Sequence, residues 1–147
     1  MNFEKLNLNW NAHPNAPQPE ILDRGRDLIL VFRLNSYVHE EFKENEWGGL
    51  KFIDVARYRM GSINDHGWYL GQCRFSKLAP AWGQFYSVSG DSILLDAPSD
   101  WITKENSSNE LSHFLFYFRD EEFECVCRRW EFAQSPDNAL LRLGRTK

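Results

Sequence analysis

Long apolar runs are missing from this chain of 147 residues. The longest uninterrupted apolar runs, at residues 28–32 and 114–118, have five residues each, whereas a membrane-spanning helix needs about 20. The first residues also lack the basic stretch and the continuous apolar stretch that form a secretory signal peptide. We therefore expect a protein without membrane-spanning segments, and we place it in the cytoplasm.

Cysteine is also scarce. Cys73, Cys125 and Cys127 are odd in number and too few for a disulfide framework, so reduced thiols are expected. The spacing of Cys125 and Cys127 would put both sulfur atoms on one side of a strand, but a second pair of metal ligands is missing. The sequence therefore predicts no metal site, and we expect both side chains to pack in an apolar core.

Sequence signals of catalysis are missing as well. The chain has no Gly-x-Ser-x-Gly elbow and no phosphate-binding loop. No two of its four histidines have the spacing of metal ligands on one helix. These motifs therefore predict no catalytic residue and no cofactor.

Positive charge is in the minority, with 17 lysines and arginines against 21 aspartates and glutamates and a net charge of −4. This balance provides no general attraction for a phosphate backbone. Arg128 and Arg129 lie beside Trp130 and could stack on bases. Glu124 and Glu131 flank them, however, which favours a charge-balanced strand surface. We do not expect a nucleic-acid partner.

Residues 112–132 have the alternation of a β-hairpin. A two-residue turn at 120–121 would place only apolar side chains on one face, namely Phe114, Phe116, Phe118, Phe123, Cys125 and Cys127. A shift by one residue would bring charged side chains into this face, so the pattern selects the parity of the register. The opposite face is mixed and is expected to meet water or a partner; it carries His113, Leu115, Tyr117, Glu124, Val126 and Arg128.

Other segments also have the pattern of strands. Counting both arms of the hairpin, about eight strands are expected, the others at residues 6–11, 26–34, 50–61, 67–75, 83–91 and 92–96. Short helices are predicted at 37–45, capped by Ser36, and from Ser135 to Gly144. We therefore predict a mainly β fold with one domain over residues 1–147, an antiparallel β-sandwich or partly closed barrel with one or two short helices.

Residues 58–91 combine glycine, tryptophan, tyrosine and polar residues densely. The Asn-Asp-His-Gly sequence at 64–67 is typical of a turn between two strands, with Gly67 at positive φ. A tightly turned β-meander would explain this composition, and the functional alternative is an aromatic-lined pocket or contact surface. That candidate binding site comprises Asp65, His66, Trp68, Tyr69, Arg74, Trp82 and Tyr86.

The favoured function is a non-catalytic binding protein that presents aromatic and acidic side chains to a protein partner. An immunity protein that neutralises a basic toxin, such as a nuclease, is one concrete version of this hypothesis. The acidic groups available to such a protein are Glu40, Glu41, Glu44, Glu46, Asp120, Glu121, Glu122 and Glu124.

A small-ligand-binding β-barrel or an enzyme is the alternative. It would have an aromatic-lined pocket and would use His66, Arg74 and nearby polar groups. Arg57 and Arg59 would join them if the small-molecule ligand were anionic. The geometry of the pocket and the distribution of surface charge distinguish these two classes of function.

Overall fold

The computed structural model describes residues 1–63, 65–72, 74–76, 78–106 and 108–134. Within them the chain forms strands and two short helices in the order β1 (Asn2–Lys5), β2 (Glu20–Arg24), β3 (Asp27–Arg33), β4 (Trp47–Ser62), α1 (Asp65–Tyr69), β5 (Phe85–Ser89), α2 (Ser92–Asp96), β6 (Ile102–Thr103), β7 (Ser112–Tyr117) and β8 (Glu121–Gln134). The predicted mainly β fold with one or two short helices is confirmed. No helix of these residues has the length and apolar character needed to cross a membrane.

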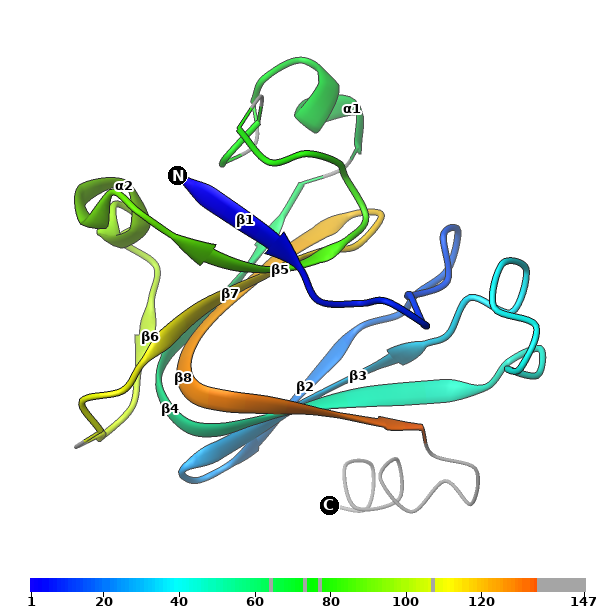
Figure 1. Ribbon diagram of the computed structural model, residues 1–147, viewed down its shortest axis with the longest axis horizontal. Coiled ribbons are helices and arrows are strands. Elements are labelled where there is room, and N and C mark those ends of the chain that lie inside the picture. The colour runs from blue at the N-terminus through cyan, green and yellow to red at the C-terminus, as the bar shows by residue number, and fades with distance from the viewer. Residues whose placement is uncertain (64, 73, 77, 107, 135–147) are drawn as a thin grey trace.

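The strands form one antiparallel sheet in the order β1-β5-β7-β8-β4-β3-β2, and β6 pairs with β4 beside this path. The outermost strands β1 and β2 are not paired with each other in the described residues, so the sheet is open (Figure 1). The long strands β4 and β8 connect two parts of the sheet, one that contains β1 and β5 and one that contains β2 and β3. A bulge interrupts the register of β4 and β8 between Val55 and Arg57. Bulges bend a strand, and both strands curve in Figure 1, so that β1 and β5 lie over β2 and β3.

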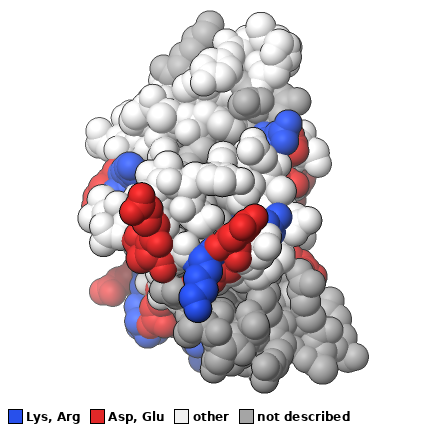
Figure 2. Space-filling model, turned by 90° about the vertical axis from the view of Figure 1, so that its right-hand side faces the viewer, with Lys and Arg blue, Asp and Glu red and all other residues white. Residues whose placement is uncertain are grey.

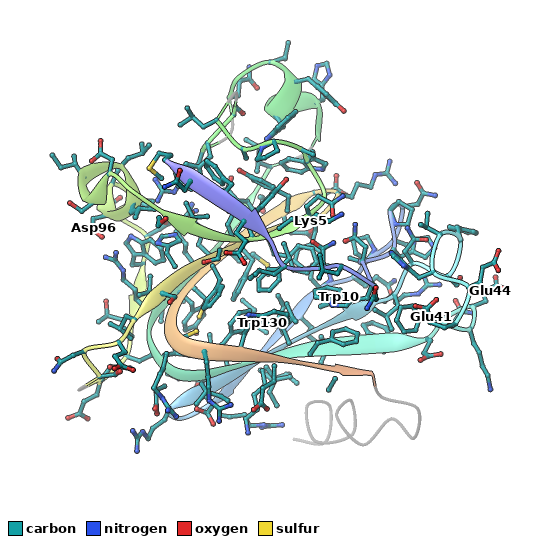
Figure 3. The ribbon with its side chains drawn as sticks, viewed as in Figure 1. Lys5, Trp10, Glu41, Glu44, Asp96 and Trp130 are labelled. Carbon is teal, nitrogen blue, oxygen red and sulfur yellow. The ribbon has the colours of Figure 1, made fainter. Side chains whose placement is uncertain are left out.

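The main core lies between the two parts of this bent sheet. Phe32 of β3 and Phe116 of β7 are in contact, with 5.3 Å between their ring centroids. Trp10, from the connection between β1 and β2, stacks on Phe132 of β8 at 4.6 Å, and Figure 3 shows Trp10 and Trp130 in the interior. The predicted apolar face of the hairpin is confirmed, because all six of its side chains belong to this core.

Cys125 and Cys127 are fully buried in the same core. Their predicted packing as small apolar side chains is confirmed. Burial raises the pKa of the Cys125 thiol, and the hydrogen bond and charge of Cys127 raise it further. The Cys125 thiol therefore stays protonated at neutral pH, which is the unreactive form.

The register of the hairpin differs from the prediction by two residues. Phe116 pairs with Phe123 and Tyr117 with Glu122, and the turn between them closes with a bond from Phe118 N to Glu121 O of 2.8 Å. The turn is longer because residues 120–121 are Asp-Glu, which is not one of the pairs that favour a two-residue turn. The shift is even, so every side chain keeps its predicted face.

Most of the second face of the hairpin is buried, and only Arg128 of its predicted residues is exposed, which corrects the expectation that this face meets water or a partner. Leu115, Tyr117 and Glu124 are at most 1% exposed. The chain between β4 and β6, which carries α1, β5 and α2, covers this face (Figure 1). A second apolar cluster forms there, made of Phe75, Ala79, Tyr86, Val88, Leu115 and Tyr117.

Some local predictions about this covering chain were wrong. The described parts of residues 67–75 and 92–96 are not strands: the first contains the end of α1, and the second is α2. Asp91 starts α2, since its Oδ1 accepts a hydrogen bond from Ile93 N at 2.9 Å. Gly67 lies inside α1 and does not have a positive φ.

The predictions nearer the N-terminus were mixed. Residues 26–34 and 83–91 contain β3 and β5 as expected, and residues 50–61 lie within the longer strand β4. The strand predicted at 6–11 lies instead at Asn2–Lys5, and residues 37–45 form turns and not a helix. The helix predicted from Ser135 to Gly144 lies outside the described residues.

Candidate functional site

Three residues of the predicted binding site form one aromatic group. The ring of Trp68 lies 5.3 Å from that of Tyr69 and 6.3 Å from that of Trp82. Trp82 in turn stacks on Tyr117 of β7 at 4.7 Å, with 24° between the ring planes. Tyr69 is 72% exposed, so this group extends from the buried second face of the hairpin to the surface.

The remaining predicted residues are placed differently. Tyr86 is buried, and its hydroxyl donates to Ala81 O at 2.9 Å, so it is a core residue. His66 is exposed on α1, which begins at Asp65. Arg74 points into the protein, where it forms part of a network of buried charges.

Glu124 is the centre of this network. Its side chain is fully buried, and its carboxylate accepts hydrogen bonds from Arg59 Nη1 at 2.6 Å and from Arg74 Nε at 2.8 Å. His113 Nε2 lies 2.6 Å from its other oxygen. Burial alone would raise the pKa of Glu124, but the hydrogen bonds and charges of His113 and Arg74 lower it to about 2. Glu124 is therefore a permanent buried anion with cationic partners.

Glu122 of the same strand behaves in the opposite way. Burial and then the negative charge of Glu124 raise the pKa of Glu122 to about 8, although Arg59 opposes this shift. Arg59 Nη1 lies 3.2 Å from Glu122 Oε1, and the same guanidinium forms two hydrogen bonds to Asp100. Arg59 is thus shared by three carboxylates, and its effect on Glu122 is smaller than the effects of burial and of Glu124. Glu122 therefore holds a proton at neutral pH.

These contacts use the arginines that the sequence suggested for an anionic ligand. Arg59 and Arg74 bind Glu124, and Arg57 forms an ion pair with Asp96. Arg74 also donates to Leu95 O at 2.7 Å, next to the end of α2. The network therefore fastens the chain around α2 to the sheet, and its cations are neutralised within the protein.

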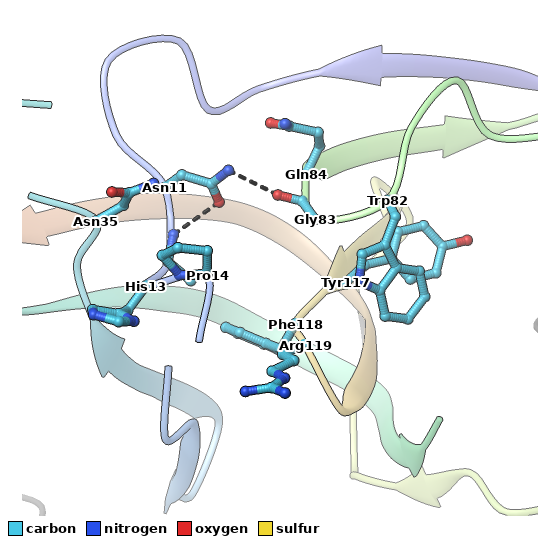
Figure 4. Close-up of a pocket in the computed structure, with 11 residues that line it drawn as sticks. Asn11, His13, Pro14, Asn35, Trp82, Gly83, Gln84, Tyr117, Phe118 and Arg119 are labelled. Atoms are coloured by element: carbon cyan, nitrogen blue, oxygen red, sulfur yellow. Dashed lines mark hydrogen bonds between the residues drawn. The ribbon is translucent and has the colours of Figure 1, made fainter. Parts of the chain in front are cut away.

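A pocket of about 290 Å³ opens beside the aromatic group (Figure 4). Figure 4 shows Pro14 and Trp82 on opposite sides of it, with Phe118 and Arg119 between them. The pocket is lined by three segments that are far apart in the sequence and by Asn35, in full Asn11, Ala12, His13, Pro14, Asn35, Trp82, Gly83, Gln84, Tyr117, Phe118 and Arg119.

Hydrogen bonds hold the walls of this pocket in place. Asn11 Nδ2 donates to Gly83 O at 2.8 Å, which links the first two segments. His13 Nδ1 accepts from Asn15 N at 3.1 Å and from Ala16 N at 3.0 Å. Desolvation and then the charge of Arg33 lower the pKa of His13. His13 is therefore a neutral ring whose proton is on Nε2.

Exposed apolar side chains continue beyond the pocket. Tyr37 and Val38 are 68% and 72% exposed, and the ring of Tyr37 lies 5.4 Å from that of His13. Figure 2 shows this side of the molecule, where a broad uncharged area lies above acidic side chains that have a basic side chain beside them. Glu41 and Glu44 project at this side in Figure 3. We call the pocket together with Tyr37, Val38, Tyr69 and Trp82 the aromatic face.

A second pocket lies at the other end of the molecule, beside the turn between β2 and β3. Its volume is about 760 Å³, and four of its charged residues form two ion pairs, Asp23 with Lys104 and Arg26 with Asp54. Asp54 has a positive φ of 53°. The lining residues are Asp23, Gly25, Arg26, Asp54, Ile102, Thr103, Lys104, Glu105 and Asn106.

The sequence prediction found only Trp82 of the first pocket. Asn11, Pro14 and Arg119 were missed because they lie outside residues 58–91, where the aromatic and polar residues are dense in the sequence. The prolines of residues 11–20 indicated a loop, and rigid surface loops are common in binding sites, which is the signal that could have pointed there.

Comparisons with protein-family models, with curated proteins and with solved structures found no match to this chain. In the described residues, no three or more His, Cys, Asp or Glu side chains are grouped so that they could hold a metal ion. The geometry of the aromatic face and of the two pockets is therefore the basis for assigning a function.

Proposed function

We propose that this protein is a non-catalytic binding protein that takes a protein partner on its aromatic face. The observation that carries this proposal is the small open pocket between Pro14 and Trp82, bordered on both sides by exposed aromatic residues. Sites for small molecules usually have about 300–1,000 Å³. At about 290 Å³, this pocket lies at the lower limit of that range, and its size also suits one side chain of a partner, because interface hot spots are often single anchors in such pockets.

The ring contacts support one continuous surface. The ring of Tyr37 contacts that of His13, which lines the pocket. The ring of Tyr69 contacts that of Trp68, which in turn contacts Trp82 of the pocket. Tyrosine and tryptophan provide much contact area for little lost side-chain entropy, and they are enriched at protein interfaces. Exposed apolar groups that adjoin one another mark interaction sites more often than scattered ones do.

An immunity-like protein that neutralises a basic toxin is the concrete version we favour. Glu40, Glu41 and Glu44 are exposed and support it. Glu122 and Glu124, which the sequence suggested as further surface acids, are buried in the charge network and do not contribute. Asp120, in the turn between β7 and β8, is also exposed. The acidic surface of this hypothesis therefore lies in the connection between β3 and β4 and in this turn.

Small-ligand binding is the second candidate, supported by the volume of the second pocket. Its 760 Å³ lie within the usual range for ligand sites. Native mass spectrometry of the protein purified from its own cells tests this candidate, because a bound small molecule adds a defined mass that disappears on denaturation.

Affinity capture from cell lysate with matched variants tests the favoured function. We expect one stoichiometric protein to be retained by the unmodified chain, and retained about tenfold less by Trp82→Ala and Tyr37→Ala. Ile93→Ala is the control, because Ile93 is 82% exposed on α2 and lies outside the aromatic face. Equal retention by all of these variants would overturn the proposal.

A further inference from the structure

We propose that the partner is a basic protein surface that inserts an aromatic side chain between Pro14 and Trp82. This inference rests on the proposed function and adds the chemistry of the partner to it. It combines two features of the aromatic face, the sign of the charge beside the pocket and the nature of the pocket walls.

An acidic segment lies beside the pocket. Residues 35–46, which connect β3 and β4, contain four glutamates and one lysine and so have a net charge of −3, whereas the whole chain has −4. Asn35, at the start of this connection, lines the pocket. Its Oδ1 accepts hydrogen bonds from Tyr37 N at 2.9 Å and Val38 N at 3.3 Å. The acidic connection is thus held against the pocket by its first residue.

The carboxylates of this connection are available to a partner. Glu40, Glu41 and Glu44 are exposed and form no ion pair with any described residue. Some carboxylates elsewhere pair with arginines, as Asp54 does with Arg26 and Asp96 with Arg57. The exposed glutamates of the connection lie beside the pocket and would attract a basic partner to it.

The walls of the pocket suit an aromatic anchor. The ring of Pro14 faces the rings of Trp82 and Tyr117 across the pocket, and Phe118 lies between them (Figure 4). A planar side chain that enters there makes apolar contacts on both sides. Arg119 also lines the pocket, and its guanidinium favours an aromatic ring over a second cation. Lysine and arginine of the partner therefore belong at the rim, opposite the glutamates, and not in the pocket.

Titration of the isotope-labelled protein with short peptides, followed by NMR, tests this inference. The probes are Lys-Lys-Trp-Lys-Lys, Glu-Glu-Trp-Glu-Glu and Lys-Lys-Ala-Lys-Lys. We expect the first to shift the amide signals of Val38, Gly83 and Arg119 at millimolar concentration. It should bind about tenfold more tightly than either of the others, because only it offers both the ring and the positive charge.

A matched pair of charge variants separates local from overall charge. Glu41→Lys with Glu44→Lys should weaken binding of the basic tryptophan peptide about fivefold or more, whereas Glu105→Lys with Glu110→Lys changes the net charge equally and should have little effect. Trp82→Ala should remove the shifts of the amide signals. Tyr37→Ala tests the same surface at an exposed position, where folding is not at risk. The amide spectrum itself shows whether each variant is folded.

Several results would overturn the inference. Tighter binding of the acidic peptide would reject the basic partner, and equal binding of the alanine peptide would reject the aromatic anchor. Shifts confined to amides outside the aromatic face, or no shift with any peptide, would reject the pocket as its acceptor. If affinity capture of a protein from lysate still depended on Trp82, these results would reject only the chemistry given to the partner. The proposed function would then remain intact.

Discussion

Arg74 Nε lies 2.8 Å from Glu124 Oε2, although the two residues are 50 positions apart in the chain. Arg74 belongs to the segment that covers the second face of the hairpin, and Glu124 lies on that face in β8. The pair therefore joins the cover to the sheet. Because both partners are largely removed from water, breaking the pair leaves an uncompensated charge in the interior.

Removal of the central carboxylate should destabilise the protein strongly. We expect Glu124→Ala to lower the free energy of unfolding by about 3–5 kcal/mol, since it leaves the buried cations without their partner. Glu131→Ala is the control: Glu131 is half-exposed and pairs with Arg129, so its loss should cost less than about 1 kcal/mol. Chemical denaturation with urea measures both, and equal effects would contradict the structural role of Glu124.

The two glutamates of the network should give opposite pH dependences. The pKa of Glu122 is raised from its ordinary value of 4.5 to about 8, so ionisation of Glu122 lowers the stability of the protein as the pH rises from about 4.5 to about 8. The pKa of Glu124 is lowered to about 2, so its contribution is present above about pH 4.5 and is lost as the pH falls towards 2.

Glu122→Gln isolates the first of these effects, because glutamine resembles the protonated acid. We expect the variant to be about as stable as the unmodified protein near pH 5 and more stable by about 1 kcal/mol or more near pH 9. Urea denaturation at both pH values measures this difference. If Glu122→Gln were less stable than the unmodified protein near pH 9, Glu122 would be ionised and held by Arg59.

Asn7 should be more important than its neighbour Asn9. Asn7 is buried; its Oδ1 accepts from Phe85 N at 3.0 Å, and its Nδ2 donates to Gln84 Oε1 at 2.8 Å. Asn7→Ala leaves a buried backbone N–H unpaired, so we expect a loss of about 2 kcal/mol. Asn9 is exposed, and Asn9→Ala should change stability by less than about 0.5 kcal/mol. Thermal and urea denaturation of both variants provide the comparison.

The buried thiols should resist alkylation in the native protein. Cys125 and Cys127 are fully buried, so the reagent has no access to either thiol. Burial also raises the pKa of Cys125, which keeps that thiol in its unreactive protonated form. Peptide mapping after treatment with iodoacetamide should find both residues unmodified without denaturant and modified in urea. Rapid labelling of Cys125 in the native protein would contradict its place in the core.

The aromatic face shows how far a candidate site could be predicted. Trp68, Tyr69 and Trp82 were grouped from their density in one segment, and the ring of Trp68 contacts the rings of the other two. Pro14 and Arg119, on the other sides of the pocket, come from segments about 70 and 35 residues away. Composition within a window carries no information about which distant loops meet there.

The sequence by itself determined the strands β3 and β4 and the two faces of the hairpin, since period-two alternation is a local property. It did not determine what covers the second face. That face mixes Leu115 and Tyr117 with His113 and Glu124, a pattern equally typical of a surface in water. Only the tertiary structure brings Arg59 and Arg74 to Glu124, and a buried carboxylate is stable only when such partners arrive from elsewhere in the chain.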